Sequence, residues 1–308
     1  MNTNSSGSQE KTDANITLKV LAWGAILIIS VPPIIYRMFE EHSPGEPITP
    51  FWLAVTQVVV LVVLWAVTWV WASVKPLQGF VLALIAYCVA MFLILPIFMD
   101  SALWSNWVEQ DSWGVSFVLA RLATHLAPLV LMSLTLIGSG IGRRELFLVR
   151  GNPRAVAEPT RLLLMKKPEP WPHVVRNFLL VYVIISVSIL GMQIRPNASQ
   201  FTQALTFLPA ILIAAAINAF AEEYEFRSVH IARLLPVLGK QQSIMITAVL
   251  WGLMHYWGFP GGAIGVLMVW YLGNIFAKSM IETRGIVWPF AIHFLGDVII
   301  YGFMAMAV

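Results

Sequence analysis

Three polar clusters interrupt apolar segments in the C-terminal third of this 308-residue chain. They read Glu222-Glu223-x-x-x-Arg227, Trp251-x-x-x-His255 and His293-x-x-x-Asp297. Ionisable groups are costly inside a membrane, and where they occur they mark a site or a transport path. Two adjacent carboxylates, two histidines and an aspartate are side chains that exchange protons, so the clusters together form a candidate catalytic set.

The first cluster contains two carboxylates that face different neighbours. On an α-helix Glu223 and Arg227 stand at i and i+4, and they can form an ion pair on one face. Glu222 is rotated by about 100° from Glu223, so it stays available to a site. The alternative is a charge cluster that caps a span at the membrane edge, and the motif alone does not decide between the two.

The two histidine clusters also follow helical spacing. Trp251 lies one turn before His255, so its indole can pack against the imidazole and orient it. His293 and Asp297 share a face and can serve as each other's partner. For His255 the alternative is a packing role, and for His293 with Asp297 it is a polar pair that joins neighbouring helices.

Glu222, His255, His293 and Asp297 could activate water in two ways. In the first, Glu222 is a general base assisted by His255, while the other two side chains position the scissile carbonyl or stabilise the oxyanion. In the second, the four side chains bind Zn²⁺, which acidifies a bound water. The sequence has no HExxH motif, and both ways remain open on the residues alone.

The composition is that of a membrane protein. Hydrophobic residues make up 58% of the chain, charged residues 11%, and the mean hydropathy is +0.77, whereas soluble domains carry about 25% charged residues. We expect an all-α fold, a polytopic transmembrane helical bundle of about eight or nine spans in a lipid bilayer, and no nucleic-acid partner. The apolar segments that could span are 17–36, 51–73, 79–99, 113–138, 177–193, 203–226, 243–258, 262–278 and 286–305.

Loop charges indicate the orientation of these spans. The segment 139–176 is rich in arginine and lysine, whereas 100–112 carries only acidic charges. Cationic short loops stay in the cytoplasm, so we expect a cytoplasmic N-terminus in a multi-pass protein of the cell membrane, the inner membrane of a bacterium.

The same loop divides the chain. We expect a disordered polar tail at 1–15, an accessory part of four spans at 16–140, a basic cytoplasmic loop at 141–176 and a catalytic helical core at 177–308. The accessory spans could hold a membrane-protein partner. No strong chemical motif lies in them.

The ordered set of clusters resembles the CPBP intramembrane proteases, the family of the CAAX prenyl endopeptidases and the bacterial Abi proteins. Their pattern is EExxxR, FxxxH and HxxxN or HxxxD, each on its own transmembrane helix, and the resemblance covers roughly 160–305. It implies a CPBP-type core and an intramembrane endopeptidase that acts on a peptide or a membrane-protein substrate. Trp251 replaces the usual phenylalanine, and Asp297 stands where CAAX endopeptidases have asparagine, so prenyl specificity does not follow.

The resemblance also implies roles for the residues. The implied catalytic residues are Glu222, Glu223, His255, His293 and Asp297, supported by Arg227 and Trp251. Glu222 would activate the water with His255 as its helper, His293 and Asp297 would line the oxyanion side, and Glu223 would support the architecture with Arg227. The glutamate-dependent mechanism needs no cofactor, and zinc is the less favoured alternative.

Two other functions use the same residues. A proton-coupled transporter would employ the buried carboxylates and histidines as relay groups, and a membrane scaffold or immunity protein would employ them structurally.

The protease hypothesis requires Glu222 and His255 to lie at the same depth in the membrane. At 1.5 Å per residue, Glu222 lies about 28 Å along a helix begun at 203, and His255 about 18 Å along one begun at 243. We therefore predict that the sixth helix starts later or continues past Arg227, with 231–238 as an amphipathic extension.

Three further polar residues lie in predicted spans. Arg121 and His125 stand at i and i+4 in the fourth span, where they are either a structural bridge or part of a site. Asn218 lies one turn before Glu222, and we expect it to form hydrogen bonds between helices.

Overall fold

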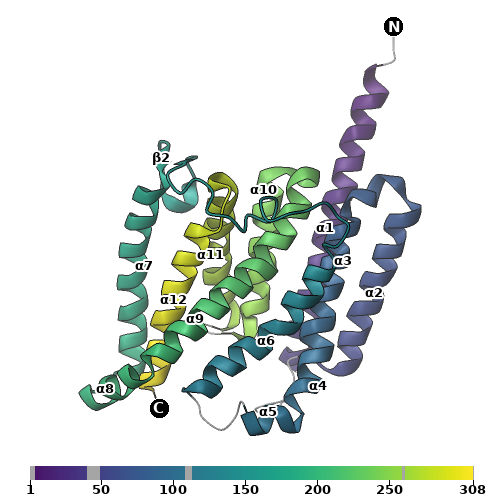
Figure 1. Ribbon diagram of the computed structural model, residues 1–308. Coiled ribbons are helices and arrows are strands. Elements are labelled where there is room, and N and C mark those ends of the chain that lie inside the picture. Colours follow the sequence, from purple (N-terminus) through teal and green to yellow (C-terminus); the bar gives the residue numbers. More distant parts are fainter. Residues whose placement is uncertain (1–3, 40–48, 108–112, 259–260, 308) are drawn as a thin grey trace. The chain divides into compact units, whose positions relative to one another are not determined.

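The chain forms a helical protein with two short strands (Figure 1). The computed structural model describes residues 4–39, 49–107, 113–258 and 261–307, with side chains described from residue 16 onward. The protein is 82% helical, which confirms the all-α class. Its helices fall into two compact units, each assembled from separate segments: Met1–Pro96, Val130–Gly142 and Glu225–Ala277 in unit 1; Ile97–Leu129, Arg143–Tyr224 and Lys278–Val308 in unit 2.

In the described part of the chain, seven helices are long and apolar enough to span a membrane, or up to eight if a bent pair is one span. The upper value of eight agrees with the predicted eight or nine spans, and the predicted spans 203–226 and 243–258 belong to one helical run, Leu208–Trp257, that is bent by 66° from the short helix before it. The physical reason is length: the first helix of this run has 16 residues, fewer than the about 20 that cross a bilayer. The cytoplasmic N-terminus remains a prediction.

Unit 1 contains the N-terminal helices and the helix that carries His255. Its elements are α1 (Asn4–Phe39), α2 (Phe51–Val70), η1 (Ala72–Leu77), α3 (Gln78–Cys88), η2 (Val89–Ile94), α10 (Val229–Met254), η5 (His255–Trp257) and most of α11 (Gly262–Thr283). Helix α1 begins at Asn4, inside the predicted tail, and its membrane-compatible part is Ile16–Phe39. Helix α10 is interrupted at Gly239, which has a φ of 76°. Glycine adopts positive φ with little steric penalty because it has no Cβ.

A side chain of α2 compensates for two prolines within α1. Pro32 and Pro33 have no N–H, so the carbonyls of Ile28 and Ile29 lose their helical donors. The side-chain amide of Gln57 donates to both carbonyl oxygens, at 2.8 and 3.0 Å. Gln57 is only 2% exposed, so a buried polar contact joins the first two spans and lets α1 continue to Phe39.

Unit 2 is built around α12. It contains α5 (Ala102–Trp107), the first part of α6 (Val115–Leu134), η3 (Arg161–Leu163), α7 (Trp171–Ile194), α8 (Ala198–Thr206), α9 (Leu208–Glu223) and α12 (Val287–Met306), and the short helix α4 (Leu95–Met99) straddles the boundary with unit 1. Helix α12 packs against α7, α8 and α9, and Figure 1 shows α7 and α12 side by side. Fully buried Ala214, Ala215 and Ala219 give α9 a narrow face, which permits close approach between membrane helices.

The basic loop is folded onto the start of α12. Its strands are β1 (Val156–Ala157) and β2 (Glu169–Pro170), paired antiparallel. The backbone N–H of Asn152 donates to the carbonyl of Thr283 at 2.7 Å. The indole N–H of Trp288, in the first turn of α12, donates to the carbonyl of Pro153 at 2.8 Å. These contacts fix the beginning of the helix that carries His293 and Asp297.

Candidate active site

The first polar cluster lies where α9 ends in an irregular turn. Helix α9 runs from Leu208 to Glu223, and a π-helical turn, η4 (Tyr224–Ser228), connects it to α10. The helix starts later than 203 and helical structure continues past Arg227, as predicted, and the depth of Glu222 relative to His255 stays a prediction. Single π turns inside α-helices are frequent at functional sites.

The π turn also affects the predicted ion pair between Glu223 and Arg227. The predicted ion pair between Glu223 and Arg227 assumed α-helical spacing, whereas a π turn joins residues i and i+5. That ion pair stays a prediction.

Within unit 2, Glu223 bonds directly to His293. Glu223 Oε1 lies 2.9 Å from His293 Nδ1, and the Glu223 side chain is fully buried. A carboxylate only accepts hydrogen bonds, so Nδ1 carries the proton and donates it. Sequence reasoning assigned Glu223 to Arg227 and missed this contact, which orients the imidazole and turns its Nε2 away from Glu223.

Two other carboxylates face the opposite nitrogen of the same ring. His293 Nε2 lies 3.8 Å from Glu222 Oε2 and 3.7 Å from Asp297 Oδ2. Both distances exceed a hydrogen bond but allow strong electrostatic interaction. The side chains of Glu222 and Asp297 are 14% and 10% exposed. Thus the structure brings together four of the five predicted catalytic residues: Glu222, Glu223, His293 and Asp297.

Asn218 joins the two carboxylates that face His293. Its side-chain nitrogen lies 3.1 Å from Asp297 Oδ2 and 3.3 Å from Glu222 Oε1. The expected hydrogen bond between helices is therefore present, from α9 to α12, and the same amide also reaches Glu222 within α9. On its other side, Asn218 Oδ1 lies 3.1 Å from His125 Nε2 of α6.

Arg121 lies one turn before His125 and contacts aromatic rings. The centre of its guanidinium is 5.2 Å from the ring centroid of Phe117 and 5.3 Å from that of Tyr301. These are cation–π distances. Tyr301 stands one turn after Asp297 on α12. Arg121 thus packs on a ring one turn from Asp297, and His125 bonds to the amide that contacts both Glu222 and Asp297.

The second cluster lies in unit 1 at the end of α10. The rings of Trp251 and His255 meet edge to face, with centroids 5.0 Å apart, which confirms the predicted packing. His255 Nδ1 lies 3.0 Å from the Trp251 carbonyl. The fully buried Arg227 places its guanidinium 3.8 Å from the Trp251 ring centroid, so it supports the indole that orients His255. The approach of His255 to Glu222 stays a prediction.

Two residues at the site were assigned no catalytic role from sequence. Asn218 and His125 are both nearly buried, at 5% and 4% exposure. Each has a sequence signal, because each is a polar residue in an apolar span, one turn from another polar residue. The spacing could identify them as site candidates, but it could not pair residues of α6 and α9.

Metal binding receives no direct support from the geometry. Among the described residues, no group of three or more histidine, cysteine, aspartate or glutamate side chains could hold a metal ion. Zinc dependence and cofactor independence both remain predictions for experiment.

The fold and the cluster define a class: a multi-pass membrane protein with a buried site of carboxylates and histidine. The family model described as type II CAAX prenyl endopeptidase Rce1-like matches residues 204–299, which confirms the resemblance of this part of the chain to the CPBP family. No curated protein and no solved structure matches the chain significantly. The family supports a membrane endopeptidase in general, and the matched segment contains all three polar clusters.

Proposed function

We propose that this protein is an integral-membrane endopeptidase in which Glu222 activates the attacking water. The observation that carries the proposal is the convergence of Glu222 Oε2 and Asp297 Oδ2 on His293 Nε2, at 3.8 and 3.7 Å. This convergence lies within the segment that matches a family of membrane endopeptidases.

Glu222 is the general base. One of its oxygens, Oε1, is held by the Asn218 amide, and the other, Oε2, faces His293. In this role Glu222 takes a proton from water as the water oxygen attacks the scissile carbonyl carbon. The proton then passes to the leaving nitrogen as the carbon–nitrogen bond breaks, which releases a carboxylate and an amine.

His293 serves the oxyanion that forms on the carbonyl. Because Nδ1 donates to Glu223, a protonated ring has its second N–H at Nε2, directed to the side where Glu222 and Asp297 lie. A donor aimed at developing negative charge stabilises the transition state more than the ground state. Glu223 balances the charge of the imidazolium and keeps the ring in this orientation.

Asp297 and His255 complete the proposal. Asp297 positions the scissile carbonyl, and it can donate to the oxyanion only when it is protonated. His255 assists Glu222 with the water, in a ring orientation that Trp251 and Arg227 support. The substrate is a peptide or a membrane protein, and the bilayer surrounds the site.

Peptide cleavage by the purified full chain tests this function. We expect cleavage of some members of a diverse peptide library in detergent or lipid vesicles, at the same rate with and without a strong chelator, because a glutamate-activated water needs no metal. The measurement is mass spectrometry of the products. Rates that fall with chelator and return with Zn²⁺ would contradict the metal-free mechanism.

The same preparation separates the other functions. Proton-dependent flux into vesicles without any proteolysis would favour a transporter. An absence of both cleavage and flux, with the protein folded, would favour a scaffold or immunity protein.

A further inference from the structure

We infer that His125 of α6 is a positioning residue of this site, acting through Asn218 on both Glu222 and Asp297. The catalytic consequence rests on the proposed endopeptidase function, whereas the hydrogen-bond arrangement does not. Helix α6 lies outside the family-matched segment 204–299. The inference therefore gives the N-terminal accessory part a role in positioning the carboxylates of the site.

The partners of Asn218 fix the orientation of its amide. The two carboxylate oxygens near it accept hydrogen bonds, so the amide nitrogen must face Glu222 and Asp297. The amide oxygen then faces His125 Nε2 at 3.1 Å. An amide oxygen only accepts, so His125 must carry a proton on Nε2 and donate it.

This donor determines how the two carboxylates are held. With its oxygen bound to His125, Asn218 directs both N–H groups at oxygens of two different helices, α9 and α12. Without the donor, the amide could rotate and present its oxygen to a carboxylate, and that contact is repulsive. Burial strengthens the effect, because a polar group that loses its partner away from water is costly.

Aromatic packing seats α6 where His125 can reach Asn218. Phe117, Arg121 and His125 follow one another at four-residue intervals and therefore share one face of the helix. Phe117 meets Tyr301 of α12 edge to face, with centroids 5.0 Å apart. Arg121 extends the contact over both rings.

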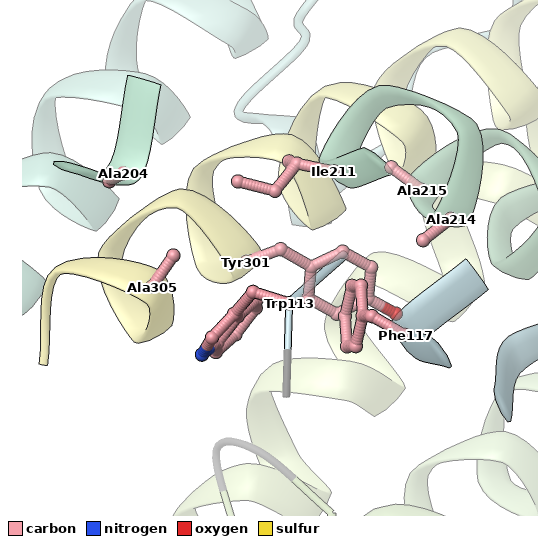
Figure 2. Close-up of a cluster of buried hydrophobic side chains, with 8 residues drawn as sticks. All are labelled: Trp113, Phe117, Ala204, Ile211, Ala214, Ala215, Tyr301 and Ala305. Carbon is pink, nitrogen blue, oxygen red and sulfur yellow. The ribbon is translucent and has the colours of Figure 1, made fainter. Parts of the chain in front are cut away.

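The buried cluster around these rings involves all three helices that build the site. Figure 2 shows the rings of Trp113, Phe117 and Tyr301 gathered together, with small side chains of α9 facing them. The members of this cluster are Trp113, Phe117, Ala204, Ile211, Ala214, Ala215, Tyr301 and Ala305. A well-packed support of this kind holds a positioning side chain within the tolerance that a catalytic site needs.

Two substitutions at His125 test the inference. His125→Phe keeps a ring of similar size but removes the donor, and His125→Gln restores an N–H donor on a flexible side chain. We expect His125→Phe to lower kcat on a cleaved peptide about 10- to 100-fold, as loss of an outer-shell partner does in other sites, with KM changed less than about threefold. His125→Gln should recover most of the kcat, and Thr124→Val, an isosteric change on the same helix, should leave it unchanged.

A double-mutant cycle with Asn218→Ala separates positioning from general damage. If His125 acts through Asn218, His125→Phe should lower kcat little further in the Asn218→Ala protein. A full additional loss there, or a His125→Phe enzyme with wild-type kcat, would overturn the inference while the endopeptidase function stands.

The same double-mutant cycle also tests the His125–Asn218 contact when no peptide is cleaved. In that case the proposed function fails, and the same four proteins are compared by their thermal unfolding midpoints in detergent. Midpoint shifts that are not additive support the His125–Asn218 contact, and additive shifts overturn it.

Discussion

Replacement of Glu222 by glutamine is expected to lower kcat about 10²- to 10⁴-fold, the range that general acid–base groups contribute. Glutamine has the size of glutamate and can still bond to Asn218, but it cannot take a proton from water. The loss should appear in kcat at an unchanged thermal unfolding midpoint. The measurement is the steady-state cleavage of a peptide identified by library profiling, at equal concentrations of folded protein.

Glu282→Gln is the matched control for this variant. Glu282 is a nearly buried carboxylate of the same unit that pairs with Lys278 and accepts a hydrogen bond from Trp171. Its loss should reduce stability and leave kcat per folded molecule near wild type. If Glu222→Gln and Glu282→Gln lowered kcat equally, loss of a buried charge would explain the effect and the role of Glu222 as base would be wrong.

Replacement of Glu223 by alanine should have the largest effect on stability. The change leaves His293 without the fully buried carboxylate that accepts from its Nδ1 at 2.9 Å. Removing one partner of a buried pair costs about 3–5 kcal/mol. We expect a clear fall in the unfolding midpoint in detergent, together with a fall in kcat of about 10²-fold or more because the imidazole is no longer oriented.

Two further variants test whether the lost bond between Glu223 and His293 causes the effects of Glu223→Ala. Glu223→Gln keeps an oxygen that can accept from His293, so it should retain more stability than alanine. In a His293→Ala background, Glu223→Ala should cost less than it does alone, because the pair is already broken. An unfolding midpoint that Glu223→Ala leaves at the wild-type value would contradict the role assigned to this bond.

The sequence was most informative about composition, the order of motifs and local packing. The apolar spans predicted an all-helical membrane protein, and the EExxxR, WxxxH and HxxxD motifs predicted the family. Spacing within one helix also predicted that Trp251 packs on His255, as observed. These features depend on local periodicity, which a single chain displays directly.

Contacts between helices were harder to predict from the sequence. The sequence suggested an ion pair of Glu223 with Arg227, because residues four apart share one face of a regular α-helix. The turn after Glu223 is π-helical, so this spacing rule does not apply to it directly. The 2.9 Å bond of Glu223 to His293, seventy residues away, depends on the packing of α9 against α12. Periodicity gives the face of each helix but not which faces meet.

Two of the predicted spans belong to one helical run for a related reason. Hydropathy identified the apolar segments of α9 and α10 separately, but it did not reveal that they continue through a helical turn. A helix of 16 residues looks like a spanning segment when the apolar residues of its flanks are included. Only the observed helix boundaries separate a full span from part of a bent run.

The central claim is that a water molecule activated by Glu222 attacks the peptide bond directly. Single-turnover cleavage in H₂¹⁸O, with enzyme in excess over peptide, tests it by mass spectrometry of the new C-terminus. We predict one ¹⁸O atom in the carboxylate of that product during the first turnover, and no product from Glu222→Gln on the same timescale. A first-turnover product containing only ¹⁶O would show that a protein carboxylate attacks the carbonyl and supplies its own oxygen through a mixed anhydride, and it would contradict the role proposed for Glu222.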